Sequence, residues 1–131
     1  MQDIFEKLKG FLPKKVKNYY EITIPVVMAI DGGLLDLKIK PISCGYKISF
    51  ERNLFIEANM GCEQELYFKI FKKYDNNFHY DIKIKNGKIF KDYTEERSIV
   101  TAIDEFVRFF IKFDNFFINN NVVGHEEDFV I

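Results

Sequence analysis

The chain has little of several residue types that mark particular classes of protein. Its 131 residues include no tryptophan, three prolines and two cysteines, Cys44 and Cys62. Two cysteines without a CxxC spacing exclude a disulfide-dense scaffold and a paired-cysteine zinc site. We therefore expect two free thiols in a reducing compartment, and a single disulfide between them stays the alternative.

Long apolar runs are also missing. No segment approaches the ~18 apolar residues of a membrane-spanning helix, and residues 1–30 hold no apolar stretch of signal-peptide length. The sequence therefore predicts a cytoplasmic protein with no membrane partner. Its abundance of Lys, Asn, Ile, Phe and Tyr is typical of AT-rich coding, which points to a low-GC bacterium or its phage.

The chain carries almost no net charge. Nineteen Lys and Arg residues oppose twenty Asp and Glu residues, for a formal net charge of −1. This balance removes the whole-molecule field expected of a nucleic-acid binder, so the sequence gives no strong nucleic-acid signal and only local patches remain. We expect a protein or ribonucleoprotein partner.

Apolar and aromatic residues are plentiful: 47% of the chain is hydrophobic, with 15 Phe and 7 Tyr. This suffices for one core in a single domain spanning residues 1–131. The most regular pattern predicts a long amphipathic helix from about Glu95 to Ile118, capped by Thr94 and ended by Asn119–Asn121. Its predicted core stripe consists of Ile99, Ala102, Ile103, Phe106, Phe109, Phe110, Phe113, Phe116 and Phe117.

Alternating apolar and polar residues predict an antiparallel sheet of about five to six strands. A short helix at residues 1–12 precedes the sheet, and a middle helix at Glu63–Tyr74, closed by Asp75–Asn77, interrupts it. The fold class is therefore α+β, with the sheet packed against the long C-terminal helix. The predicted strands cover residues 19–30, 35–39, 46–50, 54–56 and 80–85, and the last begins at residue 89.

Turn residues give further detail about this sheet. Pro25 confines the first strand to an edge or a bulge, and Pro41 is expected to end the second. The dipeptide at residues 86–87, Asn-Gly, predicts a two-residue hairpin loop. In that hairpin Ile84 faces Ile89, and Lys85 faces Lys88 next to the loop.

Three apolar residues of the long helix, Val107, Ile111 and Ile118, fall outside its core stripe. They either meet a second layer of the fold or form an apolar strip for a partner. A second candidate surface is the lysine-dense segment near the N-terminus. This segment contains Lys14, Lys15 and Lys17. These lysines either form a basic rim that binds phosphate or an acidic partner, or they belong to a solvated linker.

Catalytic and metal-binding motifs are sparse. The sequence contains no GxGxxG, P-loop, GxSxG or HExxH motif, so it predicts no cofactor. His79 and Asp81 would share one face of a predicted strand and could act as a base with an orienting acid. His125, Glu126 and Asp128 are candidate ligands of a divalent cation, in a C-terminal tail at residues 119–131 that either frays or docks.

The chain combines, in this order, a hairpin, the strand Gly45-Tyr46-Lys47-Ile48-Ser49, the middle helix, a second hairpin and the helical segment at residues 102–110. This layout resembles a family of small bacterial and phage domains of unknown function. The family usually has acidic residues after its Gly-Tyr strand, whereas this chain has Phe50-Glu51-Arg52. The resemblance implies a mobile-element or defence context and no catalytic residues.

These observations favour a non-catalytic binding protein that inhibits or neutralises a macromolecular partner. Anti-defence inhibitors such as anti-CRISPRs and toxin-immunity proteins act in this way. Two alternatives stay open. One is a small enzyme or ligand-binding domain that uses His79, Asp81 and the thiol of Cys44. The other is a structural homodimer that buries the apolar residues outside the core stripe.

Overall fold

The computed structural model describes residues 8–27, 34–51, 64–85, 88–120, 127 and 129. It confirms the α+β fold: a six-stranded antiparallel sheet is packed against two helices. In chain order the elements are η1 (Lys9–Phe11), β1 (Lys14–Val16), β2 (Tyr19–Val27), β3 (Leu34–Ile42), β4 (Gly45–Glu51), α3 (Gln64–Phe78), β5 (Lys83–Lys85), β6 (Lys88–Thr94) and α4 (Ile99–Asn120).

The sheet has the strand order β1-β2-β3-β4-β6-β5, and every neighbouring pair is antiparallel. Strands β1 to β4 form a meander. Strand β6 then pairs with β4 along seven residues, from Gly45 opposite Thr94 to Glu51 opposite Lys88. Between these two strands the chain passes through α3 and then β5, which lies at the outer edge.

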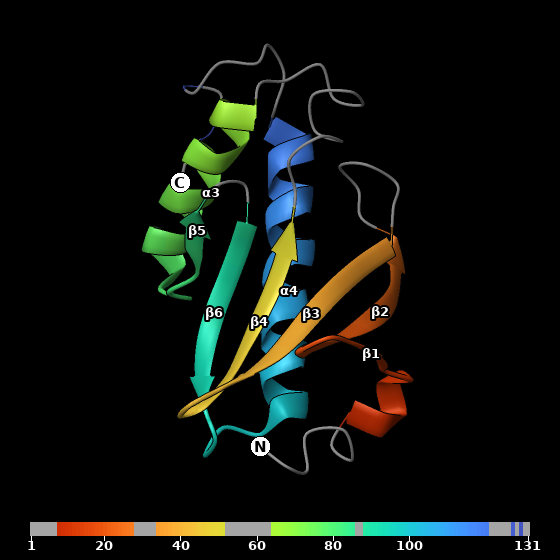
Figure 1. Cartoon of the computed structure of the whole chain (residues 1–131). Helices are drawn as coiled ribbons and strands as arrows, with labels where there is room; N and C mark the ends of the chain where they lie inside the picture. The colour runs from red at the N-terminus through yellow and green to blue at the C-terminus, as the bar shows by residue number, and fades with distance from the viewer. Residues whose placement is uncertain are drawn as a thin grey trace.

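Figure 1 shows α4 behind the sheet, running across its central strands, with α3 beside it. Alternate side chains of each strand point towards these helices because successive residues of a strand face opposite sides. Aromatic rings join the layers: Phe50 of β4 lies edge-on to Phe110 of α4 at 5.1 Å between ring centroids. Phe71 of α3 meets Phe109 and Phe113 of α4 at 5.0 Å each. Aromatic contacts therefore join the two helices to each other and to the sheet.

Polar groups inside this core are paired. The Tyr67 hydroxyl donates to Oδ1 of Asp114 at 3.0 Å, and both residues are almost completely buried. Lys91 points to the helix side of β6, where its Nζ donates to the Tyr80 carbonyl at 2.6 Å and pairs with Glu105 at 3.3 Å. Such pairing removes most of the cost of burying polar groups.

The predicted stripe of α4 is confirmed as core, with Phe116 half-buried at its edge. The predicted start of this helix was wrong. Thr94 is the last residue of β6, and α4 begins at Ile99 after a turn in which the Arg97 N–H donates to the Thr94 carbonyl. Ser98 provides the cap, because its Oγ accepts the Thr101 N–H at 3.5 Å.

The middle helix is longer than predicted and the following strand is shorter. Helix α3 continues through the polar residues at 75–77 to Phe78, where His79 adopts a left-handed conformation and donates its N–H to the Asp75 carbonyl. This is a common way to end a helix. Asp81 is also left-handed, so the extended pairing of β5 begins only at Lys83.

The N-terminal part of the sheet also differs from the prediction. Lys14–Val16, expected as a linker, forms strand β1. Pro41 does not end its strand, because β3 continues to Ile42 and Pro41 lies opposite Tyr46. Pro25 lies at a register shift between Ile24 and Val27, which confirms the bulge.

Several predicted segments lie partly or wholly outside the described residues. They are residues 1–7 of the first helix, the strand at 54–56, the hairpin loop at 86–87 and Cys62. The register on either side of that loop, Ile84 opposite Ile89, is as predicted. In the tail, the Phe129 ring stacks on Phe117 at 5.0 Å and is buried, so at least this residue docks. Neither described helix has the length and apolar character needed to span a lipid bilayer.

Candidate binding face on the open side of the sheet

The side of the sheet opposite α3 and α4 carries most of its charge. We call this surface the open face. The strand register aligns its residues in rows, because directly opposed residues of neighbouring strands point to the same side. The central row crosses all six strands and consists of Lys14, Glu21, Lys38, Ser49, Phe90 and Lys83.

Lysines outnumber acidic residues on the open face. By register, four acidic residues lie there: Glu21, Asp36, Glu51 and Asp92. The hydroxyl of Thr23 donates to Asp36 at 2.6 Å, which already occupies one oxygen of that carboxylate. The seven lysines of the open face are Lys14, Lys38, Lys40, Lys47, Lys83, Lys85 and Lys88.

Two pairs of these lysines are directly opposed. Lys40 of β3 faces Lys47 of β4, and Lys85 of β5 faces Lys88 of β6. Like charges in directly opposed positions destabilise a sheet by a few tenths of a kcal/mol. On their other sides, Lys47 lies opposite Asp92 and Lys88 opposite Glu51, so each group of three residues keeps one net positive charge, which a bound anion would neutralise. The arrangement therefore favours a negatively charged ligand.

Two aromatic rings lie among the lysines. The Nζ of Lys47 is 4.9 Å from the ring centroid of Phe90, and the Nζ of Lys38 is 5.4 Å from that of Tyr19. Both rings are half-buried and belong to the open face rather than to the core. A cation over a ring at an exposed site contributes about 0.5–1 kcal/mol. The rings thus hold the lysine side chains close to the sheet.

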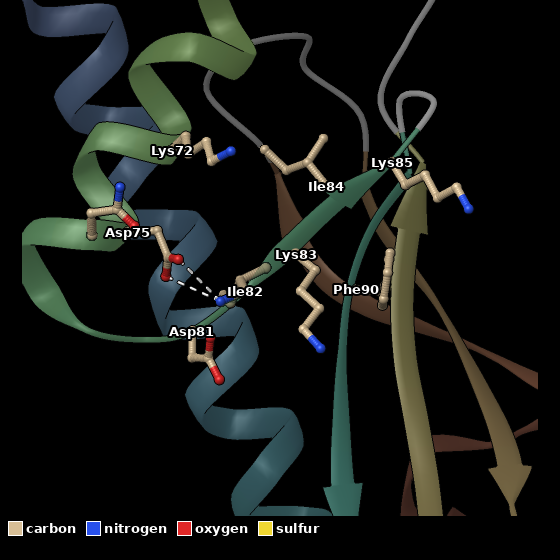
Figure 2. Close-up of a pocket in the computed structure, with 9 residues that line it drawn as sticks. Lys72, Asp75, Asp81, Ile82, Lys83, Ile84, Lys85 and Phe90 are labelled. Atoms are coloured by element: carbon tan, nitrogen blue, oxygen red, sulfur yellow. Dashed lines mark hydrogen bonds between the residues drawn. The ribbon is translucent and has the colours of Figure 1, made fainter.

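A pocket of about 430 Å³ lies at the β5 edge, between α3 and the sheet. Figure 2 shows Lys72 reaching from α3 towards β5, while Lys83 and Lys85 project from β5. Phe90 and these two lysines line the pocket and also belong to the open face. The pocket is therefore continuous with the lysine-rich surface.

Asp75 fixes the wall of this pocket. Both of its carboxylate oxygens accept the Ile82 N–H, at 3.1 and 3.2 Å (Figure 2). Burial raises the pKa of the Asp75 carboxyl above its ordinary value, and the hydrogen bond from Ile82 opposes this rise. Since Asp75 is committed to the turn that leads into β5, its role here is structural.

The predicted pair His79 and Asp81 does not lie on a strand. Both residues are exposed, in the turn between α3 and β5, and both have left-handed backbone conformations. Asp81 lines the pocket, whereas His79 is not among the pocket residues. The expectation of two side chains on one strand face was therefore wrong. Cys44, the third residue of the enzyme hypothesis, is an exposed free thiol in the turn before β4.

The predicted metal ligands His125, Glu126 and Asp128 lie outside the described residues. Among the residues that the structure does describe, no three His, Cys, Asp or Glu side chains are grouped closely enough to hold a metal ion. The metal hypothesis for the tail stays a prediction.

The lysines predicted as a basic rim do not share one face. Lys14 belongs to the open face, Lys15 lies opposite Tyr20 on the other side of β1, and Lys17 has a left-handed conformation in the following turn. All three are exposed. Their role in partner binding stays a prediction.

The apolar residues of α4 outside the predicted stripe are mostly covered. Val107 is 9% exposed and belongs to the core, while Ile111 and Ile118 are half-buried against it. Val107 therefore offers little surface to a partner. The partner role of the two isoleucines and the homodimer stay predictions.

Sequence reasoning did not find the open face as a unit. Each strand alone shows an ordinary pattern with polar residues on its wet side, as at Lys38 and Lys40. Only the strand order places β4 next to β6, and so brings Lys47 beside Asp92 and Phe90 beside Ser49. No protein-family model, curated protein or solved structure matches the chain.

Proposed function

We propose that this chain is a non-catalytic binding protein that inhibits or neutralises a macromolecular partner in the cytoplasm of a bacterial or phage-infected cell. An anti-defence inhibitor, such as an anti-CRISPR, or a toxin-immunity protein would act in this way. The observation that carries the proposal is the concentration of lysines on the open face of a protein whose net charge is only −1. A local excess of one charge attracts and orients an oppositely charged partner.

The geometry also explains how a binding surface is kept rigid. The lysines of the open face project from a sheet whose other side is fixed by an aromatic core. Sites built on strands are held more accurately than sites on loops. Inhibition then requires only that the protein cover a surface that the partner needs.

Capture of the partner tests this proposal. The purified protein, immobilised, is exposed to extract of its source cell, alongside the double variant Lys40→Glu/Lys47→Glu. The matched control is Lys73→Glu/Lys112→Glu, which changes the net charge equally at two exposed helix positions. We expect the wild type and the control to retain the same identified partner and the open-face variant to lose it.

Activity of the captured partner gives the second readout. Addition of the wild-type protein should reduce that activity, and the open-face variant should not. Recovery of no macromolecule, equal recovery by all three proteins, or a partner whose activity is unchanged would each contradict the proposal.

A further inference from the structure

We infer that the open face binds single-stranded nucleic acid, with the phosphates on its lysines and a base stacked on Phe90. This inference rests on the proposed function and names the class of partner. Two classes of macromolecule could supply the negative charge: an acidic protein surface and a nucleic-acid strand. The composition of the open face distinguishes them.

Lysine is the distinguishing residue. The cores of protein–protein interfaces are depleted in lysine relative to the rest of the surface and enriched in arginine. The open face has seven lysines by register, and no arginine is among its described residues. Lysine binds phosphate as a point charge and is a usual contact to nucleic-acid backbones. The composition therefore fits phosphates better than a carboxylate-bearing protein surface.

Phe90 supplies the second argument. It lies in the central row, between Ser49 and Lys83, so its ring is on the side of the lysines rather than in the core. Bases stack on aromatic side chains of open sheets, and this contact tolerates any base sequence. A stacked base gains more than an exposed cation does over the same ring. A strand would thus displace Lys47 from Phe90 and release its charge to a neighbouring phosphate.

The pocket beside Phe90 continues this path. Its volume of about 430 Å³ is within the range of small-molecule sites, and its lining includes three lysines and two carboxylates: Lys72, Lys83, Lys85, Asp75 and Asp81. A single strand that crosses the open face and reaches the β5 edge can place one nucleotide in this pocket. A duplex cannot do so, because its bases are paired and stacked within the helix.

Fluorescence anisotropy with labelled oligonucleotides tests the inference. The probes are single-stranded RNA and DNA of mixed sequence, about 16 nucleotides long, a duplex of equal length, and a polyglutamate peptide of matched charge. We expect the single strands to bind more tightly than the duplex or the peptide. The logarithm of their affinity should fall linearly with the logarithm of salt concentration.

Two sets of variants separate charge from stacking. Lys40→Gln/Lys47→Gln should reduce the salt slope by about 1.4, since each lost phosphate contact removes about 0.7. Lys73→Gln/Lys112→Gln should leave it unchanged. Phe90→Leu should weaken binding about tenfold with an unchanged slope. Phe78→Leu, at a 51%-exposed ring outside the open face, is the control. Circular dichroism confirms that each variant is folded.

Some outcomes would overturn the inference. One is binding of the peptide or the duplex as tightly as the single strands. Another is an unchanged affinity in Phe90→Leu together with an unchanged slope in the open-face lysine variant. If partner capture still depends on Lys40 and Lys47 in that case, the proposed binding function stands and its partner is an acidic protein. If capture is also independent of these lysines, the proposed function fails as well.

Discussion

Adding a single methyl group at Gly45 should strongly destabilise the sheet. A Cβ built at Gly45 would lie 1.9 Å from the Tyr93 carbonyl oxygen and 2.9 Å from two backbone atoms of Thr94. Ordinary contact begins at 3.4 Å, so the overlap with the carbonyl is about 1.5 Å. Both neighbours are backbone atoms, and no side-chain rotation relieves the clash. Gly45→Ala must therefore push β4 and β6 apart.

The cost follows from what this separation breaks. The two strands end with Gly45 opposite Thr94 and Tyr46 opposite Tyr93, whose rings stack at 5.5 Å. Loss of one or two ladder hydrogen bonds costs about 0.5–1.5 kcal/mol each, and loss of an aromatic pair costs a similar amount. We expect Gly45→Ala to lower the free energy of unfolding by about 2–4 kcal/mol, or roughly 10 °C in melting temperature.

Urea unfolding followed by far-UV circular dichroism measures this loss. The control is Gly10→Ala, because a Cβ at Gly10 meets nothing within 4 Å. It should be neutral or stabilise by up to about 1 kcal/mol. A Gly45→Ala protein within about 0.5 kcal/mol of the wild type would refute the close approach of β4 and β6.

Three further predictions follow from buried groups. Asp75→Ala should lower the free energy of unfolding by about 1–3 kcal/mol, because the Ile82 N–H loses its acceptor. Asp75→Asn keeps an oxygen acceptor and should lose less, so an equal loss would contradict the bonding. Burial raises the pKa of Tyr46 from 10.0 to about 12. The contribution of the neutral Tyr46 hydroxyl to the free energy of unfolding is therefore fully present below pH 10 and is lost as the pH rises from 10 to 12. Tyr46→Phe, which also removes the hydrogen bond to the Arg97 carbonyl, should make the fall of the unfolding free energy less steep in that window. A smaller slope remains, because burial also raises the pKa of Tyr93. A slope equal to that of the wild type would argue against this origin. Phe129→Ala should make the C-terminal tail more sensitive to limited proteolysis, because the ring that docks on α4 is gone; unchanged cleavage would exclude this anchor.

The sequence predicted those features of the fold that depend on local periodicity. The stripe of α4 is an example, since Phe106, Phe110 and Phe113 recur at helical spacing and are all completely buried. The register of the hairpin between β5 and β6 is another, because loop length alone determines which residues are opposed. Neither prediction depended on contacts between segments that are distant in the chain.

Two of the errors occurred where a contact with another segment overrides the local pattern. Asp75–Asn77 is a typical helix-ending sequence, yet α3 continues because the Asp75 carboxylate accepts the Ile82 N–H seven residues later. The same contact shortens β5. Thr94 is a good helix cap by type, but it is needed in β6, and Ser98 caps α4 instead. Local propensity was overridden by tertiary bonding in each case.

The candidate site was beyond sequence reasoning for a different reason. Lys38, Lys47 and Lys83 are separated by many residues, and each is explained by a wet strand face when taken alone. Their significance depends on neighbouring positions in a sheet whose order is not the chain order. Overall neutrality hides such a face, because acidic residues elsewhere balance it in the sum. A binding surface made by register is therefore visible only after the strands are placed side by side, which is how Lys40 and Lys47 come to lie directly opposite each other.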